Sequence, residues 1–199
     1  PMVTDRLALR RSLFALAAEQ GGYFTAAQAK ELGYSYQAQA HHVRAENWLR
    51  VDRGLFRLAP WVPEPHDHLA RWTLWSKGRA VVSHRSALSV HDIGEFESPR
   101  LEMTVPPGFS ARDSGVQLFV AQLPAEDLLP RRGFRVTTVL RSLIDVAGTQ
   151  PDSDQLARAI AESIKSGKVT ARLLRARSEQ VDLRAALAIE RALGLLAEQ

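Results

Sequence analysis

The sequence contains no cysteine among its 199 residues. Without a thiol, the chain cannot form a disulfide, hold zinc through thiolates or use a cysteine nucleophile. This absence excludes disulfide-stabilised secreted scaffolds and cysteine zinc fingers. It is typical of a protein from a reducing compartment, so we expect a cytoplasmic location.

Long apolar runs are also absent. A membrane-spanning helix needs about 20 consecutive apolar residues, and no stretch of the sequence approaches this length. The N-terminal residues lack the apolar stretch of a secretory signal. The hydrophobic content of 45% is nevertheless enough for one large domain or two small ones. The sequence therefore predicts a folded protein without a membrane partner.

Motifs for catalysis and cofactor binding are missing as well. No stretch resembles a glycine-rich phosphate loop or a dinucleotide fingerprint, and the stretch around His84 has no glycine-flanked nucleophile and no matching acid. The histidine pairs His41 with His42 and His66 with His68 lack a third ligand at a convincing spacing. The sequence predicts a protein that is not an enzyme, with no catalytic residue, no metal site and no cofactor.

Positive charge is present and unevenly distributed. Of the net charge of +4, residues 1–60 contribute +3, with 8 Lys/Arg against 5 Asp/Glu. Residues 61–150 hold 10 of each sign, and residues 151–199 hold 8 basic against 7 acidic. Clustered basic charge attracts phosphates, although an excess this small also occurs on ordinary protein surfaces.

Three short helices are predicted in this basic N-terminal segment. Apolar residues recur at helical spacing over 4–19, where Thr4 or Asp5 is available as the N-cap. A second helix over 25–33 and a third over 35–47 each begin at a hydroxyl side chain, and a glycine ends the second. Two short helices joined by a tight turn with glycine are the signature of a helix-turn-helix.

The stretch AENWLRVDRGLFRLAP, residues 45–60, predicts a β-hairpin. Apolar and charged residues are interleaved, so that one face of each strand can be apolar, and Asp52-Arg53-Gly54 supplies the turn. We expect the apolar side to pack on the helices while the arginines point outward. The N-terminal domain, residues 4–60, is therefore predicted to be a winged helix-turn-helix that binds DNA.

The third helix of a winged helix lies in the major groove, where its outer face reaches base edges. With Val43 facing inward, we expect Gln39, His42 and Asn47 to lie at or near the core. The outward residues are then Tyr36, Gln37, Ala40, His41 and Arg44.

Glutamine and arginine have the fork geometry that base edges require, whereas Lys30, Ser35 and Tyr36 suit phosphates. On the wing, the arginines would grip the backbone or the minor groove; these are Arg50, Arg53 and Arg57. The alternative is a winged helix used for protein contacts, with a solvated arginine face.

A second domain is predicted over residues 66–199. The boundary at 59–66 follows from three prolines within ten residues. Strands are expected within RLEMTVPP, GVQLFVAQL and GFRVTT, with helices over 66–78, after Ser83, from Thr138, and over 153–165, 170–177 and 182–197. This pattern predicts a mixed α+β domain with a helical C-terminal end.

Three stretches occur in a characteristic order. LRVDRGLFRLAP ends the predicted winged helix, VVSHRSALSVHDIGE follows, and FRVTTVLRSLIDVAG comes last. Together they resemble the AbiEi-type antitoxins, which are transcriptional regulators of bacterial toxin–antitoxin systems. The similarity covers residues 5–150 well and the remaining helices more loosely.

This resemblance implies a protein with two functions. The winged helix would bind inverted repeats in its own promoter and repress the operon, and the second domain would counteract a nucleotidyltransferase-like toxin, by direct contact or otherwise. The DNA-contacting positions of the family fall here on Gln37, His41, Arg44, Arg50, Arg53 and Arg57. His42 and Gln39 depart from the aliphatic pair that is commoner in the family.

The other two motifs are interpreted as structural. We expect His84 and Thr138 to be capping or hydrogen-bonding residues, and Arg141 and Asp145, at i and i+4, to pair on a helix face. A second hypothesis stays open, namely a plain winged-helix transcriptional regulator whose second domain senses a ligand or mediates oligomerisation.

Overall fold

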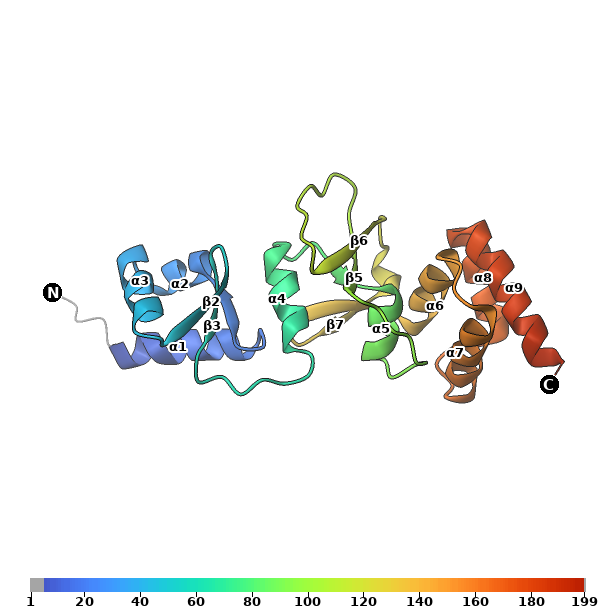
Figure 1. The fold of residues 1–199 in the computed structure, drawn as a ribbon, viewed down its shortest axis with the longest axis horizontal. Helices are drawn as coiled ribbons and strands as arrows, with labels where there is room; N and C mark the ends of the chain where they lie inside the picture. The colour runs from blue at the N-terminus through green and yellow to red at the C-terminus, as the bar shows by residue number, and fades with distance from the viewer. Residues whose placement is uncertain (1–5, 199) are drawn as a thin grey trace. The chain divides into compact units, whose positions relative to one another are not determined.

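The computed structural model describes residues 6–198 and has a mixed α+β architecture, as the sequence predicts. Two compact units are present (Figure 1). The first is formed by the described part of Pro1–Arg79 with Arg131–Phe134, and the second by Ala80–Pro130 with the described part of Arg135–Gln199. The N-cap candidates Thr4 and Asp5 lie outside the described residues.

The first unit combines four helices with a small antiparallel sheet in the described residues. The strand order is β1-β3-β2. The sequence does not predict strand β1, because three residues are too few to show an alternating pattern. The elements are α1 Arg6–Ala18, β1 Tyr23–Thr25, α2 Ala26–Leu32, α3 Tyr36–Arg44, β2 Trp48–Asp52, β3 Leu55–Leu58 and α4 Asp67–Trp75.

Helices α2 and α3 begin where their hydroxyl caps predict. The Thr25 hydroxyl accepts a hydrogen bond from the Gln28 N–H at 3.1 Å, and the Gln28 side chain accepts one from the Thr25 N–H at 2.9 Å. Gly33 ends α2 with φ +118°, a conformation that favours glycine. Ser35 then caps α3 by accepting from the Ala38 N–H at 3.1 Å. The turn between the helices is therefore fixed at both ends.

An aromatic core joins these helices to the sheet. Phe24 from β1 packs edge-on against Trp48 from β2, with ring centroids 4.8 Å apart, and lies 5.8 Å from Phe56 of β3. Leu13 of α1 and Tyr34 from the turn are buried in the same cluster. This core holds the hairpin against α2 and α3.

The proline-rich segment after β3 is fastened to the same unit. Trp61 lies so close to Gly22 that a Cβ at Gly22 would stand 2.3 Å from the Trp61 ring, which only glycine allows. The Trp61 indole N–H donates to the Asp67 carboxylate at 2.8 Å, which also accepts from the Glu64 N–H at 2.7 Å. These contacts tie the start of α4 to the first unit.

The second unit contains a five-stranded sheet of order β6-β5-β4-β8-β7. Strands β5 and β6 are parallel, β4 and β5 antiparallel, and β4 and β8 parallel. The tip of the β7–β8 hairpin, Arg131–Phe134, is grouped with the first unit. The elements are β4 Val81–Val82, α5 His84–Val90, β5 Leu101–Val105, β6 Val116–Val120, the 3-10 helix η1 Ala125–Asp127, β7 Leu128–Arg131, β8 Phe134–Thr137, α6 Val139–Gly148, α7 Ser153–Lys165, α8 Ala171–Val181 and α9 Leu183–Ala197.

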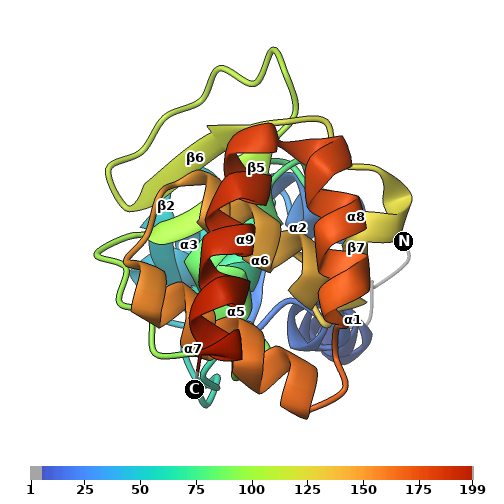
Figure 2. The same cartoon turned by 90° about the vertical axis from the view of Figure 1, so that its right-hand side faces the viewer.

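Helix α9 packs against α6, α7 and α8, and these four helices share one apolar core (Figure 2). Leu143 and Ile144 of α6, Ile160 of α7 and Ile189 of α9 are fully buried there. Within residues 6–198, no helix combines the length and the apolar composition needed to cross a membrane.

Candidate nucleic-acid interface

The outer face of α3 carries an exposed polar stripe. Gln37, His41 and Arg44 follow one another at i, i+4 and i+7, so they line one side of the helix, and all three are exposed. Tyr36 is also exposed, whereas Ala40 is half-buried. The stripe presents an amide, an imidazole and a guanidinium, the groups that can form hydrogen bonds with base edges and phosphates.

The inner face of α3 accommodates a buried amide. Gln39 is only 3% exposed, and its side-chain NH₂ donates to the carbonyl oxygens of Ala26 at 3.0 Å and Tyr34 at 3.1 Å. A buried polar group costs little when its hydrogen bonds are made. Gln39 therefore fixes α3 to the start of α2 and to the turn, and its departure from an aliphatic residue does not loosen the helix.

His42 also faces inward, where its ring stacks on Trp48 at 4.8 Å between centroids and 17° between planes. Burial lowers the pKa of His42, and the neighbouring His41 lowers it further. Asn47 was expected at or near the core but is exposed, because it follows the end of α3 at Arg44. Its amide lies 3.1 Å from His42 Nδ1 and forms a hydrogen bond there.

The residues expected to contact phosphates lie in the last turn of α2 and at the start of α3. The Lys30 ammonium is 4.7 Å from the centroid of the Tyr36 ring, a cation–π contact that joins α2 to α3. The Ser35 oxygen caps the helix, so its O–H remains able to donate. All three side chains belong to exposed residues.

The arginines of the hairpin lie on two different faces of the sheet. Arg50 is paired in register with Phe56, and its guanidinium lies 5.7 Å from that ring, so it shares the face that packs on the helices. Arg57 is paired with Tyr23 and Leu49, which point to the opposite face. Arg53 is exposed in the turn between the strands.

Arg57 is the most confined of these cations. It is half-buried, and its Nε atom is buried without a hydrogen-bond partner in the described residues. The expectation that all hairpin arginines point outward together therefore needs a correction. Side chains alternate between the two faces along a strand. Arg50 is paired with Phe56, the residue next to Arg57, so Arg50 and Arg57 point to opposite faces.

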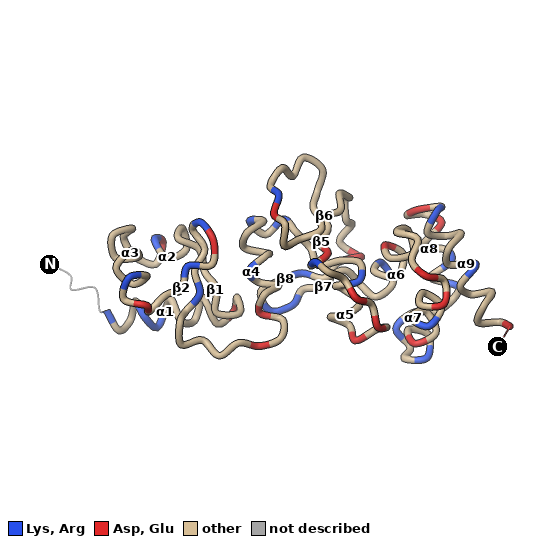
Figure 3. The backbone as a smooth tube through the Cα atoms, viewed as in Figure 1, with Lys and Arg blue, Asp and Glu red and all other residues tan. Residues whose placement is uncertain are grey.

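These basic side chains have no acidic partners among the described residues. Within residues 6–198, no ion pair involves Arg44, Arg50, Arg53 or Arg57. Figure 3 shows the Lys and Arg positions along α3 and the β2–β3 hairpin. A cation without a neutralising carboxylate can bind a phosphate without first breaking an internal pair.

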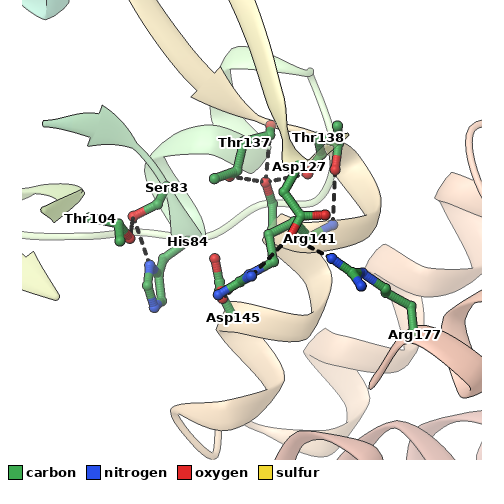
Figure 4. A network of polar contacts seen from close by, with 10 residues as sticks. Ser83, His84, Thr104, Asp127, Thr137, Thr138, Arg141, Asp145 and Arg177 are labelled. Atoms are coloured by element: carbon green, nitrogen blue, oxygen red, sulfur yellow. Dashed lines mark hydrogen bonds and ion pairs between the residues drawn. The ribbon is translucent and has the colours of Figure 1, made fainter. Parts of the chain in front are cut away.

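The second unit uses arginine in a different way (Figure 4). Arg141 of α6 is 8% exposed at its side chain and pairs with Asp145 at 2.8 Å, as the i, i+4 spacing predicts. It also pairs with Asp127 of η1 at 2.9 Å, and Arg177 of α8 reaches the same Asp127 oxygen at 3.0 Å. The spacing within one helix could not indicate Asp127 or Arg177, because both come from other elements.

This network shifts the ionisation of its members. Burial opposes the charge of Arg141, but the carboxylates of Asp145 and Asp127 outweigh it and raise the pKa of Arg141. Burial raises the pKa of Asp145 to about 6, although Arg141 acts in the opposite direction. The second carboxylate oxygen of Asp145 is buried without a hydrogen-bond partner in the described residues, which explains why burial dominates.

Thr138 caps α6 by accepting from the Arg141 N–H at 3.2 Å, as expected. Ser83 occupies the N-cap position of α5, but its hydroxyl does not cap the helix. It bonds His84 Nδ1 at 2.8 Å and accepts from Thr104 at 2.8 Å, while Glu102 of β5 accepts from the Arg85 N–H instead. The helix start is therefore capped from the neighbouring strand.

His84 is the unusual residue at this position. It has φ +54° at the first turn of α5 and stacks on Phe119 with ring centroids 3.6 Å apart. Burial, followed by the nearby Arg141 and Arg85, lowers the pKa of His84 to about 3, so the ring is neutral at pH 7. In the part of the chain that the structure describes, no three acidic or histidine side chains gather as a metal site requires.

Comparison with known proteins supports the N-terminal assignment. Residues 11–59 match the family model described as "Transcriptional regulator, AbiEi antitoxin". The match covers α2, α3 and the β2–β3 hairpin, and it confirms the resemblance to AbiEi antitoxins over these residues. The description of this family names a transcriptional regulator that is also an antitoxin. No curated protein matches the chain.

Among the solved structures similar to this chain, one aligns with nearly its whole length. It is the crystal structure of the RV2827C protein from Mycobacterium tuberculosis, with a TM-score of 0.62 and 15% sequence identity. The alignment covers 96% of this chain and 80% of the mycobacterial chain. At this identity the likeness shows a shared fold.

Proposed function

We propose that this protein is the antitoxin of a bacterial toxin–antitoxin system and represses its own operon. In this proposal, the first unit is a winged helix-turn-helix that binds inverted repeats in the promoter. The second unit counteracts a nucleotidyltransferase-like toxin. The observation that carries the proposal is the family match over residues 11–59, which coincides with the unpaired basic side chains of α3 and the hairpin.

The positions and chemical groups of these side chains suggest which of them contact bases and which contact phosphates. Gln37 and Arg44, on the exposed stripe of α3, would read base edges, because an amide and a guanidinium can each form two parallel hydrogen bonds there. His41 lies between them on the same stripe. Lys30, Ser35 and Tyr36 would contact phosphates at the start of the helix and fix its register on the duplex.

The hairpin would supply further phosphate contacts. Arg50 and Arg53 are exposed, and Arg50 shares the helix-facing side of the sheet with Phe56. These two cations are placed to act together with α3. Arg57 emerges on the other face, so we assign it a smaller part in the same interface.

The role of the second unit rests on the antitoxin description of the family and on the VVSHRSALSVHDIGE and FRVTTVLRSLIDVAG motifs. The family match ends at residue 59, and this observation favours a second candidate function, a winged-helix regulator whose second unit senses a ligand or mediates oligomerisation. Neutralisation of a toxin distinguishes the two candidates.

Full-length variants can test both activities at once. Cells carry the toxin gene under an inducible promoter and a reporter behind the protein's own promoter. The variant R44A/R53A removes two exposed cations of the first unit, and the control R172A/R184A removes two from exposed positions of the second. Full-length chains are needed because Arg131–Phe134 belongs to the first unit, so a cut near residue 66 would divide that unit.

We expect R44A/R53A to lose repression of the reporter while still protecting cells from the toxin, and the control to retain both activities. Protein levels are measured by immunoblot. Protection lost together with repression would assign neutralisation to the first unit, and no protection by the wild type would favour the plain regulator.

A further inference from the structure

The sheet of the second unit has two edge strands. The strand order β6-β5-β4-β8-β7 places β6 and β7 at its two ends. An end strand presents a row of backbone N–H and C=O groups to its surroundings, which makes it a template for pairing with another strand.

The two end strands differ in how they are protected. β7 has four residues and includes Pro130 and Arg131, both of which discourage pairing. β6, Val116–Val120, has five residues and contains neither proline nor a charged side chain. Val120 at its end is 60% exposed. The β6 edge therefore lacks the usual sequence features that prevent association.

The outward backbone groups of β6 can be assigned from its pairing with β5. The Ala121 N–H donates to the Val105 carbonyl at 3.1 Å, just beyond the strand. The backbone N–H and C=O groups of successive residues point to opposite edges of a strand, so those of Phe119 and Gln117 also point toward β5. The N–H and C=O groups of the three intervening residues point away from the sheet; these residues are Val116, Leu118 and Val120.

Side-chain contacts on one face of the sheet hold β6 in place. The Phe119 ring stacks on His84 with 17° between the ring planes, and the Gln117 side chain accepts a hydrogen bond from Arg100 at 2.5 Å. β6 is therefore already ordered, so a strand that pairs with it would not lose free energy by ordering β6.

We propose that β6 pairs antiparallel with β6 of a second copy of this chain, about a two-fold axis at Leu118. The strand is self-complementary in this arrangement, because Val116 of each copy lies opposite Val120 of the other and Leu118 lies opposite itself. Three outward N–H groups on each copy would form six new backbone hydrogen bonds. No charge would be buried within the paired strands.

The choice of a second copy over a foreign strand also draws on symmetry. A two-fold dimer matches two half-sites of an inverted repeat, and in this respect the inference rests on the proposed function. The structural argument for the edge uses only the second unit. The two ideas can therefore fail separately.

Sedimentation equilibrium of the full-length protein tests the pairing. We expect the wild type to reach twice the monomer mass of 22.1 kDa at micromolar concentrations, with and without DNA. V120K places a charge on the edge, and L118P removes an outward N–H without touching the β5 ladder. Both should sediment as monomers under conditions where the wild type is dimeric.

The matched control is V62K, which makes the same substitution at a valine that is 79% exposed in the first unit; it should remain dimeric. Circular dichroism identifies any variant that fails to fold. If L118P fails to fold, the sedimentation of V120K alone tests the pairing. A wild type that stays monomeric at all concentrations overturns the proposal, as does a dimer that persists in V120K.

Hydrogen exchange provides a test that needs no mutation. We expect the amides of Leu118 and Val120 to gain protection as the protein concentration rises. A dimer that leaves them fast-exchanging would use another surface and would contradict the inference. We expect V120K and the wild type to bind a single half-site with the same affinity. A wild type that binds DNA but stays monomeric would refute only the β6 pairing. A wild type that forms the β6-paired dimer but does not bind DNA would refute only the proposed function.

Discussion

Arginine has opposite roles in the two units of this protein. In the first unit, Arg44 and Arg53 are exposed and form no ion pair with any described residue. In the second, Arg141 is buried between two carboxylates, and Arg177 shares one of them. A basic residue therefore indicates a phosphate-binding surface only when its charge has no internal partner.

The energetic consequences of the two settings also differ. A buried ion pair contributes little when intact, but removal of one partner leaves an uncompensated charge inside the protein. An exposed arginine without a partner contributes little to folding and remains available for binding. Substitutions in the second unit should therefore change stability, and substitutions in the first should change DNA binding.

The largest effect is expected from R141A, which removes the one ion pair that Asp145 forms within residues 6–198. We expect the free energy of unfolding to fall by about 3 to 5 kcal/mol, measured by urea denaturation at pH 7. The control R175A breaks the half-exposed pair with Glu190 and should cost about 1 kcal/mol or less. Equal losses for the two variants would remove the distinction between buried and surface arginines.

The next effect concerns pH. The folded pKa of Asp145, about 6, lies above its ordinary value of 3.8, so this carboxyl contributes stability below about pH 3.8, and that contribution is lost as the pH rises through about 6. In D145N this loss, on the order of 3 kcal/mol, should disappear, and the curve of stability against pH should become flatter between pH 4 and 7. A curve parallel to that of the wild type would mean that Asp145 does not titrate in this range.

Base readout by α3 is tested by Q37A. If Gln37 forms a bidentate contact, its loss should reduce discrimination at one base pair by about 1 to 3 kcal/mol and leave the salt dependence unchanged. Competition binding with a library of single-base operator variants measures this change. A uniform weakening across all sequences would instead place Gln37 among the backbone contacts.

The smallest effects separate the two faces of the hairpin. R53A should weaken binding to every sequence and reduce the slope of log affinity against log salt by about 1. R57A should change the slope by less, because Arg57 emerges on the face opposite Arg50. Fluorescence anisotropy at several salt concentrations gives both slopes, and a larger change for R57A would reverse the assignment of the DNA-facing side.

Local signals in the sequence predict much of the first unit. The caps at Thr25 and Ser35 and the positive φ at Gly33 depend on short-range chemistry, so helices α2 and α3 lie where these residues place them. The exposed stripe of α3 follows from helical periodicity once Val43 is taken as inward. Asn47 is misplaced in this scheme because the helix ends three residues earlier.

The remaining features depend on contacts between distant parts of the chain. The sequence pattern indicates only that Arg50 and Arg57 are polar residues of the hairpin. The strand register shows that they lie on opposite faces. The pairing of Arg141 with Asp127, and the capping of α5 by Glu102, join residues from separate elements. A single sequence carries no local signal for such contacts.

The central claim is that four cations of the first unit bind the phosphates of DNA, namely Lys30, Arg50, Arg53 and Arg57. Its most direct test is the affinity of the full-length protein for its promoter DNA at 50 mM and at 200 mM salt. Four phosphate contacts predict a fall of about 10²-fold between these conditions. An affinity that stays constant within about twofold would contradict the account.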